Sequence, residues 1–239
     1  MAMNNSIGDR MKRYERVSNH VLVRRMPVIV RVDGRAFHTF TRTFDRPFDK
    51  FIMDTMNYAA KCVLKDMQGC KLAYVQSDEA SFLLTDYDTI DTQAWFDNEL
   101  QKLVSISAAM MTGVFVSRCI NWEVKIKCQC PPVFDSRAFN VPREDVANYF
   151  LWRAKDWERN SLQMYARANF SHKELHEKNS ADIHEMLHSK GRNWTKDLTD
   201  RQKNGTWISC TDTSDSTIMP NYKAIAAVVD PLLAPAQTE

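Results

Sequence analysis

An apolar run at residues 72–84 is interrupted in its middle by Ser77, Asp78 and Glu79. Apolar and β-branched residues on both sides of a short polar break are typical of two strands joined by a tight turn. Two adjacent carboxylates inside such a run are costly to desolvate unless a positive group is bound beside them. The stretch therefore predicts a β-hairpin whose tip forms half of a metal site.

We expect the other half at Asp33, which ends a strand-like run at residues 27–33. Mg²⁺ prefers oxygen ligands and is often held by one or two carboxylates together with substrate phosphates. Two such ions about 4 Å apart can stabilise the attacking and leaving oxygens of nucleotidyl transfer. Ser and Asp are also ordinary turn residues, so a purely structural hairpin is the alternative interpretation.

A loop at residues 34–40 follows the first strand and begins with Gly34. A glycine directly after a strand lets the backbone approach a ligand or adopt a positive φ. One glycine does not make a Walker-type phosphate loop. The backbone N–H groups of the loop could still form an anion-binding concavity.

The order of the predicted elements brings Asp33 and Asp78 together. From the first strand to the fourth it is β-α-β-β-α-β, the split βαβ or ferredoxin-like arrangement and also that of a polymerase palm. The predicted fold class is therefore α+β, with an antiparallel sheet in which these two residues are neighbours. The expected elements are a helix at 7–20, a strand at 27–33, a helix at 48–67, a hairpin at 71–76 and 79–84, a helix at 91–116 and a strand at 132–139.

The rest of the chain is expected to be mainly helical. We therefore divide it into a palm-like catalytic domain at 1–140 and a helical part at 141–239 packed on it, or treat both as one continuous domain. The later elements are helices at 143–169 and 182–190, a strand at 205–210 and a loose tail at 235–239.

The composition favours a reduced, cytoplasmic compartment. The six cysteines include no CxxC pair, and no apolar leader opens the chain. Cys128 and Cys130 are too close in sequence for a standard zinc pair and are expected to be structural. No apolar run is expected to reach the roughly 18 residues that a membrane span needs, so we expect no membrane partner. The net charge of +2 is only weak support for a polyanionic partner.

Three further motifs have two interpretations each. Residues 184–188 form a literal HExxH, as in zinc hydrolases, but Trp194 stands where the extended motif has its third histidine. A surface helix with coincidental histidines is therefore favoured. The basic and aromatic residues at 152–159 suit RNA, or a helix with core tryptophans and solvated charges. The basic face of the helix at 7–20 fits either solvent or RNA, with solvent favoured.

Two motifs together resemble those of the tRNA-His guanylyltransferase superfamily, the 3′–5′ nucleotide-adding polymerases. They are residues 30–40, Val-Arg-Val-Asp-Gly-Arg-Ala-Phe-His-Thr-Phe, and residues 76–82, Gln-Ser-Asp-Glu-Ala-Ser-Phe. The resemblance extends over roughly residues 7–173. It implies a palm that works in reverse, in which the 3′-hydroxyl of an incoming nucleotide attacks an activated or triphosphorylated RNA 5′ end. It also implies GTP and ATP as substrates, tRNA as partner and a homotetramer.

The resemblance assigns the catalytic roles to named residues. Asp33 and Asp78 look like ligands of two Mg²⁺ ions, assisted by the carbonyl of Gly34. Glu79 matches the third acidic residue of the family. These assignments agree with the metal site that the two strand ends predict.

The same resemblance implies a nucleotide-binding loop. His38 and Ser77 would lie near the triphosphate. Arg46 stands where the family often has Lys, a change that could alter the geometry of a phosphate contact. The loop residues that would cradle the nucleotide are Gly34, Arg35, Ala36, Phe37 and His38.

One departure from the family pattern bears on the reaction. Eukaryotic members carry His-Ile-Asn-Asn-Leu-Tyr-Asn after a Trp-Arg pair, whereas residues 158–164 here are Glu-Arg-Asn-Ser-Leu-Gln-Met. This resembles the "like protein" branch of bacteria and archaea, which is associated with template-dependent repair of 5′-truncated tRNA. Addition of a single G to tRNA-His is the other possibility. A cyclase-like palm enzyme acting on nucleoside triphosphates and a non-enzymatic RNA-binding module are the alternatives.

Overall fold

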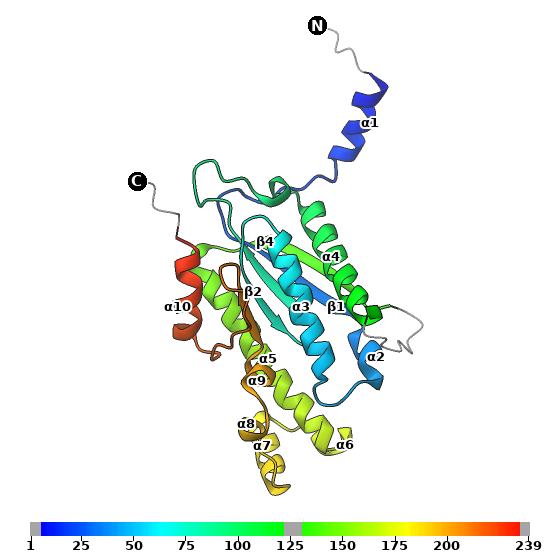
Figure 1. The fold of residues 1–239 in the computed structure, drawn as a ribbon, viewed down its shortest axis with the longest axis vertical. Helices are drawn as coiled ribbons and strands as arrows, with labels where there is room; N and C mark the ends of the chain where they lie inside the picture. Colours follow the sequence, from blue (N-terminus) through cyan, green and yellow to red (C-terminus); the bar gives the residue numbers. More distant parts are fainter. Residues whose placement is uncertain (1–5, 122–130, 235–239) are drawn as a thin grey trace.

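A computed structural model of the chain describes residues 6–121 and 131–234. Its centre is a five-stranded antiparallel sheet in the order β4-β1-β3-β2-β5 (Figure 1). The first four strands and the helices between them form the predicted palm, so the α+β fold class is confirmed. The strands are β1 Val28–Arg35, β2 Cys70–Gln76, β3 Glu79–Leu84, β4 Val133–Asn140 and β5 Thr206–Ser209.

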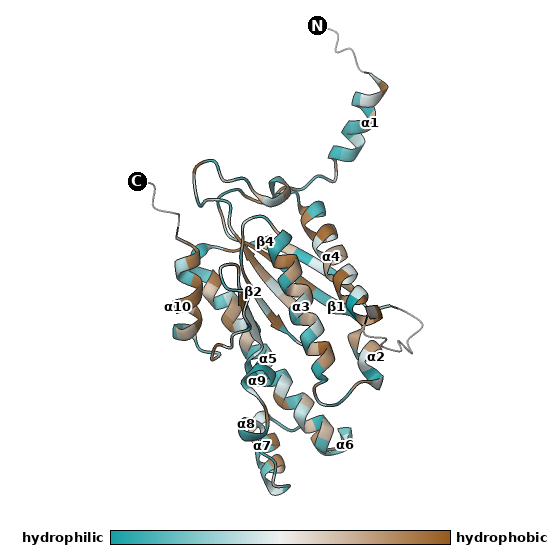
Figure 2. Cartoon of the chain, in the orientation of Figure 1, coloured by the Kyte–Doolittle hydropathy of each residue, from teal (hydrophilic) through white to brown (hydrophobic). Residues whose placement is uncertain are grey.

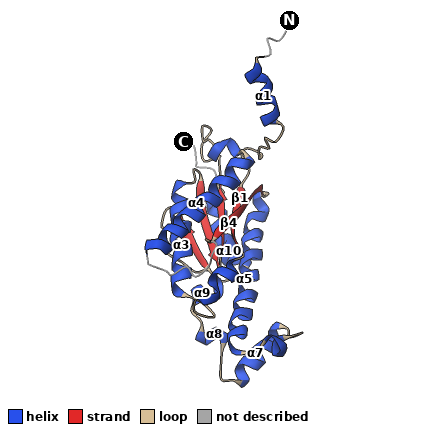
Figure 3. Cartoon of the chain, turned by 90° about the vertical axis from the view of Figure 1, so that its right-hand side faces the viewer, coloured by secondary structure: helices blue, strands red, loops and turns tan. Residues whose placement is uncertain are grey.

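Helices cover both faces of the sheet. On one face lie α3 (Lys50–Asp66) and α4 (Leu100–Asn121), and on the other lie α5 (Val146–Asn169) and α10 (Tyr222–Leu232). Figure 3 shows the strands between these layers. The sheet is therefore the middle layer of three.

The side chains of β1 alternate between the two cores. Val28, Val30 and Val32 pack in the core under α3 and α4, whereas Ile29 packs in the core under α5 and α10. A strand that is buried on both faces needs apolar residues at consecutive positions. This explains the unbroken apolar run at the start of β1.

The remaining helices are short. They are α1 Ile7–Arg16, α2 Phe37–Phe40, α6 His172–Leu175, α7 Ser180–Ser189, α8 Trp194–Asp197 and α9 Asp200–Asn204, with 3-10 turns at Thr41–Thr43, Trp95–Asn98 and Arg143–Asp145. α1 has no buried residue and extends away from the body (Figure 1). α7 and α8 pack on α5 through a small separate core around Leu162, Ile183 and Trp194. Figure 2 shows apolar residues concentrated along the sheet and in α4.

Several boundaries differ from the prediction. The helix expected at 91–116 begins only at Leu100, because Phe96, Asp97 and Asn98 have φ values of +50°, +50° and +60° and turn the chain first. It also runs five residues further, to Asn121. The hairpin and the late strand are confirmed within one residue or two.

Two smaller expectations are also corrected. The loop expected at 34–40 contains one helical turn, α2, which starts after Ala36 at a φ of +53°. The first helix ends at Arg16 rather than at residue 20. The expected structural role of Cys128 and Cys130 and the expected loose tail at 235–239 lie outside the described residues.

α4 overturns the expectation that no apolar run would be long enough to span a membrane. By length and composition alone, the segment Leu100–Ile120 is long and apolar enough to do so. In the fold it packs against β4, β1 and α3. Leu103, Met111 and Phe115 are fully buried there. A helix in a protein core shares this composition with a membrane span, and 28% of the apolar window of α4 is buried in this fold.

Candidate active site

The tip of the β2–β3 hairpin lies beside the end of β1. Asp33 is the cross-strand partner of Glu79, and the backbone N–H of Gly34 donates to the carbonyl of Asp78 at 3.0 Å. Ser77 turns the chain with a φ of +49°, a conformation that residues with a side chain seldom adopt. The fold thus joins the two acidic strand ends that the sequence singles out.

Both carboxyl groups at this junction hold their protons more tightly than usual. Burial raises the pKa of Asp78 to about 6, with a further contribution from Asp33, although a hydrogen bond from Ser77 acts in the opposite direction. Burial also raises the pKa of Asp33, and Asp135 on the neighbouring strand adds to this effect. Arg31, Arg137 and Arg153 act in the opposite direction on Asp33, but its pKa stays raised. Two carboxyl groups in such surroundings fit a divalent cation.

The donor set suits Mg²⁺ bound together with a substrate. Among the described residues, no three or more His, Cys, Asp or Glu side chains are grouped to hold a metal ion. The protein ligands here would therefore be Asp33, Asp78 and the backbone carbonyl of Gly34. Mg²⁺ commonly completes such a small set with water and substrate phosphates.

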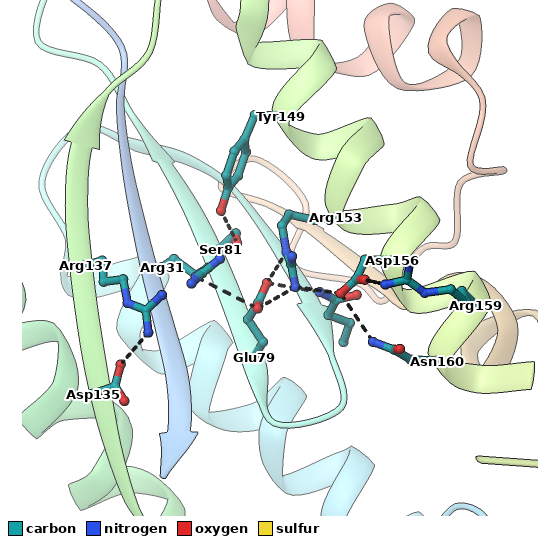
Figure 4. A network of polar contacts seen from close by, with 11 residues as sticks. Arg31, Glu79, Ser81, Asp135, Arg137, Tyr149, Arg153, Asp156, Arg159 and Asn160 are labelled. Carbon is teal, nitrogen blue, oxygen red and sulfur yellow. Dashed lines mark hydrogen bonds and ion pairs between the residues drawn. The ribbon is translucent and has the colours of Figure 1, made fainter. Parts of the chain in front are cut away.

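Glu79 has a different environment from Asp78. Its carboxylate accepts hydrogen bonds from Arg153 Nε and Nη2 at 2.7 Å each and from Gln76 Nε2 at 3.0 Å. Arg31 Nε lies 4.0 Å away (Figure 4). Glu79 is buried, and its oxygens are occupied by these partners. It ties the hairpin tip to α5.

The helix at 152–159 combines both interpretations of its sequence. Trp157 is buried in the protein, whereas Trp152 is 55% exposed, with the Arg153 guanidinium 4.6 Å from its ring centre. Arg153 Nη2 also donates to Asp156 at 3.2 Å, and Asp156 pairs with Arg159 (Figure 4). The contact of this helix with RNA stays a prediction.

A cavity of about 520 Å³ opens beside Asp78. This volume is within the range of about 300–1,000 Å³ that is usual for ligand pockets. One wall comes from the first half of the chain and includes predicted residues: Gly34, Ala36, Phe37, His38, Arg46, Ser77 and Asp78. The other wall comes from the second half of the chain: Trp157, Met164, Arg167, Ala168, Arg201, Gly205 and Thr206.

The predicted loop residues have unequal surroundings. Arg35 is exposed at the end of β1 and does not line the cavity. Phe37 is buried against Phe40, Phe115 and Phe134 and anchors the loop. A Cβ at Gly34 would lie 2.3 Å from the Phe37 ring, so only glycine fits this approach.

Comparisons with known proteins agree with this geometry. The family model of tRNAHis guanylyltransferase matches residues 8–142, more than half of the chain. The chain belongs to the tRNA-His guanylyltransferase family. The guanylyltransferase of Schizosaccharomyces pombe is 30% identical over 83% of this chain and 78% of its own length. The probable guanylyltransferase of Dictyostelium discoideum is 32% identical over 67% of this chain and 61% of its own length.

Solved guanylyltransferase structures extend the match to the second wall. A bacterial guanylyltransferase-like protein in complex with ATP has a TM-score of 0.86 and 40% identity, over 95% of this chain and 99% of its own. The corresponding complex with GTP gives 0.81 and 37%, over the same shares. The Saccharomyces cerevisiae guanylyltransferase gives 0.72 and 25%, over 83% and 91%. The resemblance predicted from the two motifs is confirmed.

In the present chain, the HExxH residues 184–188 belong to α7, where Glu185 and His188 are exposed. His188 Nε2 is 3.2 Å from the side-chain nitrogen of Asn193, and the His184 ring centre is 6.0 Å from that of Trp194. The position of a third zinc ligand is thus filled by a tryptophan that packs on the helix. No His, Cys, Asp or Glu cluster of metal-binding size includes these residues in the part of the chain that the structure describes.

Sequence reasoning missed most of the second wall of the guanylyltransferase cavity. Arg167 carried a signal, since it continues the basic and aromatic helix. Arg201 and Thr206 carried none, because short polar segments such as α9 have no chemical motif. Thr206 enters the site because β5 pairs with β2, and Arg201 enters it because α9 packs on α5.

Proposed function

We propose that this chain is a Mg²⁺-dependent enzyme that adds nucleotides to the 5′ end of tRNA in the 3′–5′ direction. The observation that carries this proposal is a pair of carboxyl groups with raised pKa values, Asp33 and Asp78, beside a nucleotide-sized cavity. Membership of a nucleotidyltransferase family supports the class of reaction. The ATP and GTP held by the bacterial relatives support nucleoside triphosphates as substrates.

The residues have complementary parts in this reaction. Asp33 and Asp78 would hold Mg²⁺, which supplies charge stabilisation on the attacking and leaving oxygens. Arg46, His38 and Ser77 line the same cavity, which supports a role for them in contacting phosphates. The 3′-hydroxyl of the incoming nucleotide forms a bond to the α-phosphate of the RNA 5′ end. The bond to the leaving pyrophosphate or nucleoside monophosphate breaks, and the hydroxyl proton goes to solvent or to a leaving oxygen.

We further propose templated repair of 5′-truncated tRNA as the main activity. In the family's His-Ile-Asn-Asn-Leu-Tyr-Asn run, the His, an Asn and the Tyr are replaced within 158–164. Ser161 in this run is buried and links α5 to α8 and α9. Its hydroxyl donates to the Gln202 carbonyl at 2.8 Å and accepts from Trp194 Nε1 at 3.1 Å. Met164 lines the cavity in place of an asparagine. These contacts support a site that differs from that of the eukaryotic enzymes.

An assay with 5′-truncated tRNAs tests both the reaction and the branch. With the templating base varied, we expect the added nucleotide to follow the template and to require Mg²⁺. Asp78→Ala is expected to abolish addition in a folded protein, whereas Glu185→Ala, on the exposed side of α7, is expected to leave it unchanged. Addition by folded Asp78→Ala at the normal rate would contradict the site. Products formed without RNA would favour a cyclase-like enzyme.

The cellular setting and assembly are proposals of the same kind. The described cysteines, Cys62, Cys70, Cys119 and Cys210, are free thiols, which supports the cytoplasm. A homotetramer rests on the family resemblance. Analytical ultracentrifugation of the purified chain tests the assembly.

A further inference from the structure

Arg201 is held rigidly in the second wall of the cavity. It lies on α9, whose start is fixed by a capping box between Thr199 and Gln202. The Gln202 carbonyl accepts the hydrogen bond from Ser161 of α5. Arg201 Nη1 donates to Asp54 Oδ1 of α3 at 2.6 Å. The guanidinium is thereby fixed between two helices from opposite halves of the chain.

The other edge of this guanidinium has no partner. Arg201 Nε and Nη2 are both buried and make no hydrogen bond within the described residues. These two atoms form the edge that presents two parallel N–H groups, which fits a phosphate or carboxylate. A buried donor without an acceptor costs free energy, so this edge favours a ligand that supplies the acceptors. Both atoms are shielded from solvent, so such a ligand reaches them only with a local rearrangement of the cavity wall.

Neighbouring groups in the same wall also favour an acceptor ligand. Trp157 Nε1 is a donor only, and it too is buried without a partner among the described residues. Arg167 lines the cavity and has no ion pair in the described part of the chain. Gln76 Oε1 is the one orphaned acceptor here, and its amide is oriented by the bond from Nε2 to Glu79.

The charge of Arg201 is not cancelled by Asp54. Asp54 Oδ1 accepts from Arg201, and its other oxygen accepts from Lys50 Nζ at 2.6 Å. One carboxylate is therefore shared by two cations. Asp54 does not line the cavity, and the acidic residues that do are Asp45, Asp49 and Asp78. Asp49 caps α3 by accepting from the backbone N–H of Ile52, and Asp78 belongs to the hairpin tip.

We propose that Arg201, together with Arg167 and Trp157 Nε1, binds a phosphate group of a substrate at the C-terminal wall of the cavity. The proposal rests on the proposed function and adds a second phosphate contact region to the one around Asp33 and Asp78. The phosphate belongs either to the nucleoside triphosphate or to the 5′ end of the RNA. Both sources offer the same bidentate acceptor to the Nε–Nη2 edge.

Binding measurements with and without phosphate test the site. We compare ATP with adenosine, and an RNA hairpin bearing a 5′-triphosphate with the same hairpin bearing a 5′-hydroxyl. In Arg201→Gln, one of the two phosphate-bearing probes is expected to bind at least about tenfold more weakly, because bonds to charged groups are worth this much. Adenosine and the 5′-hydroxyl RNA are expected to bind as in the wild type. The probe that weakens identifies the source of the phosphate.

Arg192→Gln is the matched control, because Arg192 is exposed, lies nearby in sequence and does not line the cavity. It is expected to change none of the four affinities. If thermal unfolding shows that Arg201→Gln is not folded, Arg201→Lys replaces it in the comparison. This variant keeps the charge but loses the two parallel donors. Phosphate-dependent affinity ratios equal to those of the wild type in a folded variant overturn the proposal.

The same experiment separates this site from the proposed function. A protein that binds phosphate through Arg201 but adds no nucleotide to any truncated tRNA contradicts the proposed function and supports the site. An active enzyme whose phosphate-dependent affinity ratios do not change on Arg201→Gln supports the proposed function and overturns the phosphate site at Arg201.

Discussion

Burial raises the pKa of Asp78 to about 6, and the nearby carboxylate of Asp33 adds to the effect. The folded protein therefore binds this proton more tightly than the unfolded chain does. The corresponding stabilisation is fully present below an ordinary aspartate pKa of about 4. It is lost as the pH rises through about 6. At neutral pH, without a bound cation, Asp78 thus opposes folding.

We expect Asp78→Asn to stabilise the protein in EDTA at neutral pH. The gain should be about 2–3 kcal/mol, which follows from a pKa of about 6 against 3.8. It should shrink towards zero near about pH 4, where the wild-type carboxyl group is protonated. Urea unfolding of both proteins at each pH measures this. A variant that is less stable than the wild type at both pH values would contradict the raised pKa.

Glu79 and Arg153 form a buried pair, since each side chain is only 9% exposed. We expect Glu79→Gln to lower the free energy of unfolding by at most about 3–5 kcal/mol, because it leaves the buried arginine charge with Asp156 as its remaining carboxylate partner. The double substitution Glu79→Gln with Arg153→Met should recover part of this loss. Chemical denaturation of the single and double variants gives the coupling energy. Additive losses would argue against the pair as a unit.

Strand β5 depends on the glycine that precedes it. Gly205 has a φ of +76°, and a Cβ there would lie 2.8 Å from the Val75 carbonyl oxygen. We expect Gly205→Ala to destabilise the protein by about 1–3 kcal/mol. Gly113→Ala is the control, because Gly113 lies in helix α4 with nothing within 4 Å of the new atom. It should be neutral or stabilising by up to about 1 kcal/mol. Thermal unfolding distinguishes them, and equal effects would contradict the strain.

The elements that the sequence predicted well are those whose signal is local. The hairpin at 71–84 follows from strand residues around a polar turn, and Asp33 follows from the glycine after β1. The start of α4 was missed because apolar residues such as Trp95 continue the helical spacing, while left-handed backbone at Phe96–Asn98 breaks it. Nothing local in the sequence marks that break.

The candidate site was predictable only on its palm side. Asp78 and Ser77 are found from the interrupted strand, but the contacts of Glu79 depend on Arg153, which lies 74 residues later. Arg201 reaches α3 across 147 residues of sequence. Such contacts are set by how α5 and α9 pack on the sheet, and a pattern within one segment does not contain them.

The net charge of the protein gives RNA little general attraction. The formal net charge is +2 on 239 residues, so binding must rest on local arginines. For a tRNA with a 5′-triphosphate, we expect Arg46→Gln with Arg167→Gln to reduce the slope of log affinity against log salt by about 1.4–1.8, since each lost phosphate contact contributes about 0.7–0.9. Arg192→Gln should leave the slope unchanged. If the double variant keeps the wild-type slope of log affinity against log salt, Arg46 and Arg167 do not contact the RNA phosphates.

The pairing of β5 with β2 has a consequence for protein synthesis. Strands β1 to β4 are complete once residue 140 has been made, but the outer edge of β2 then has no neighbour. An unpaired edge is open to wrong partners until it is covered. The edge is covered, and the cavity gains its second wall, only after residues 201–209 leave the ribosome. A nascent chain that ends at residue 140 therefore lacks the second wall of the cavity, so a ligand that needs both walls cannot bind to it.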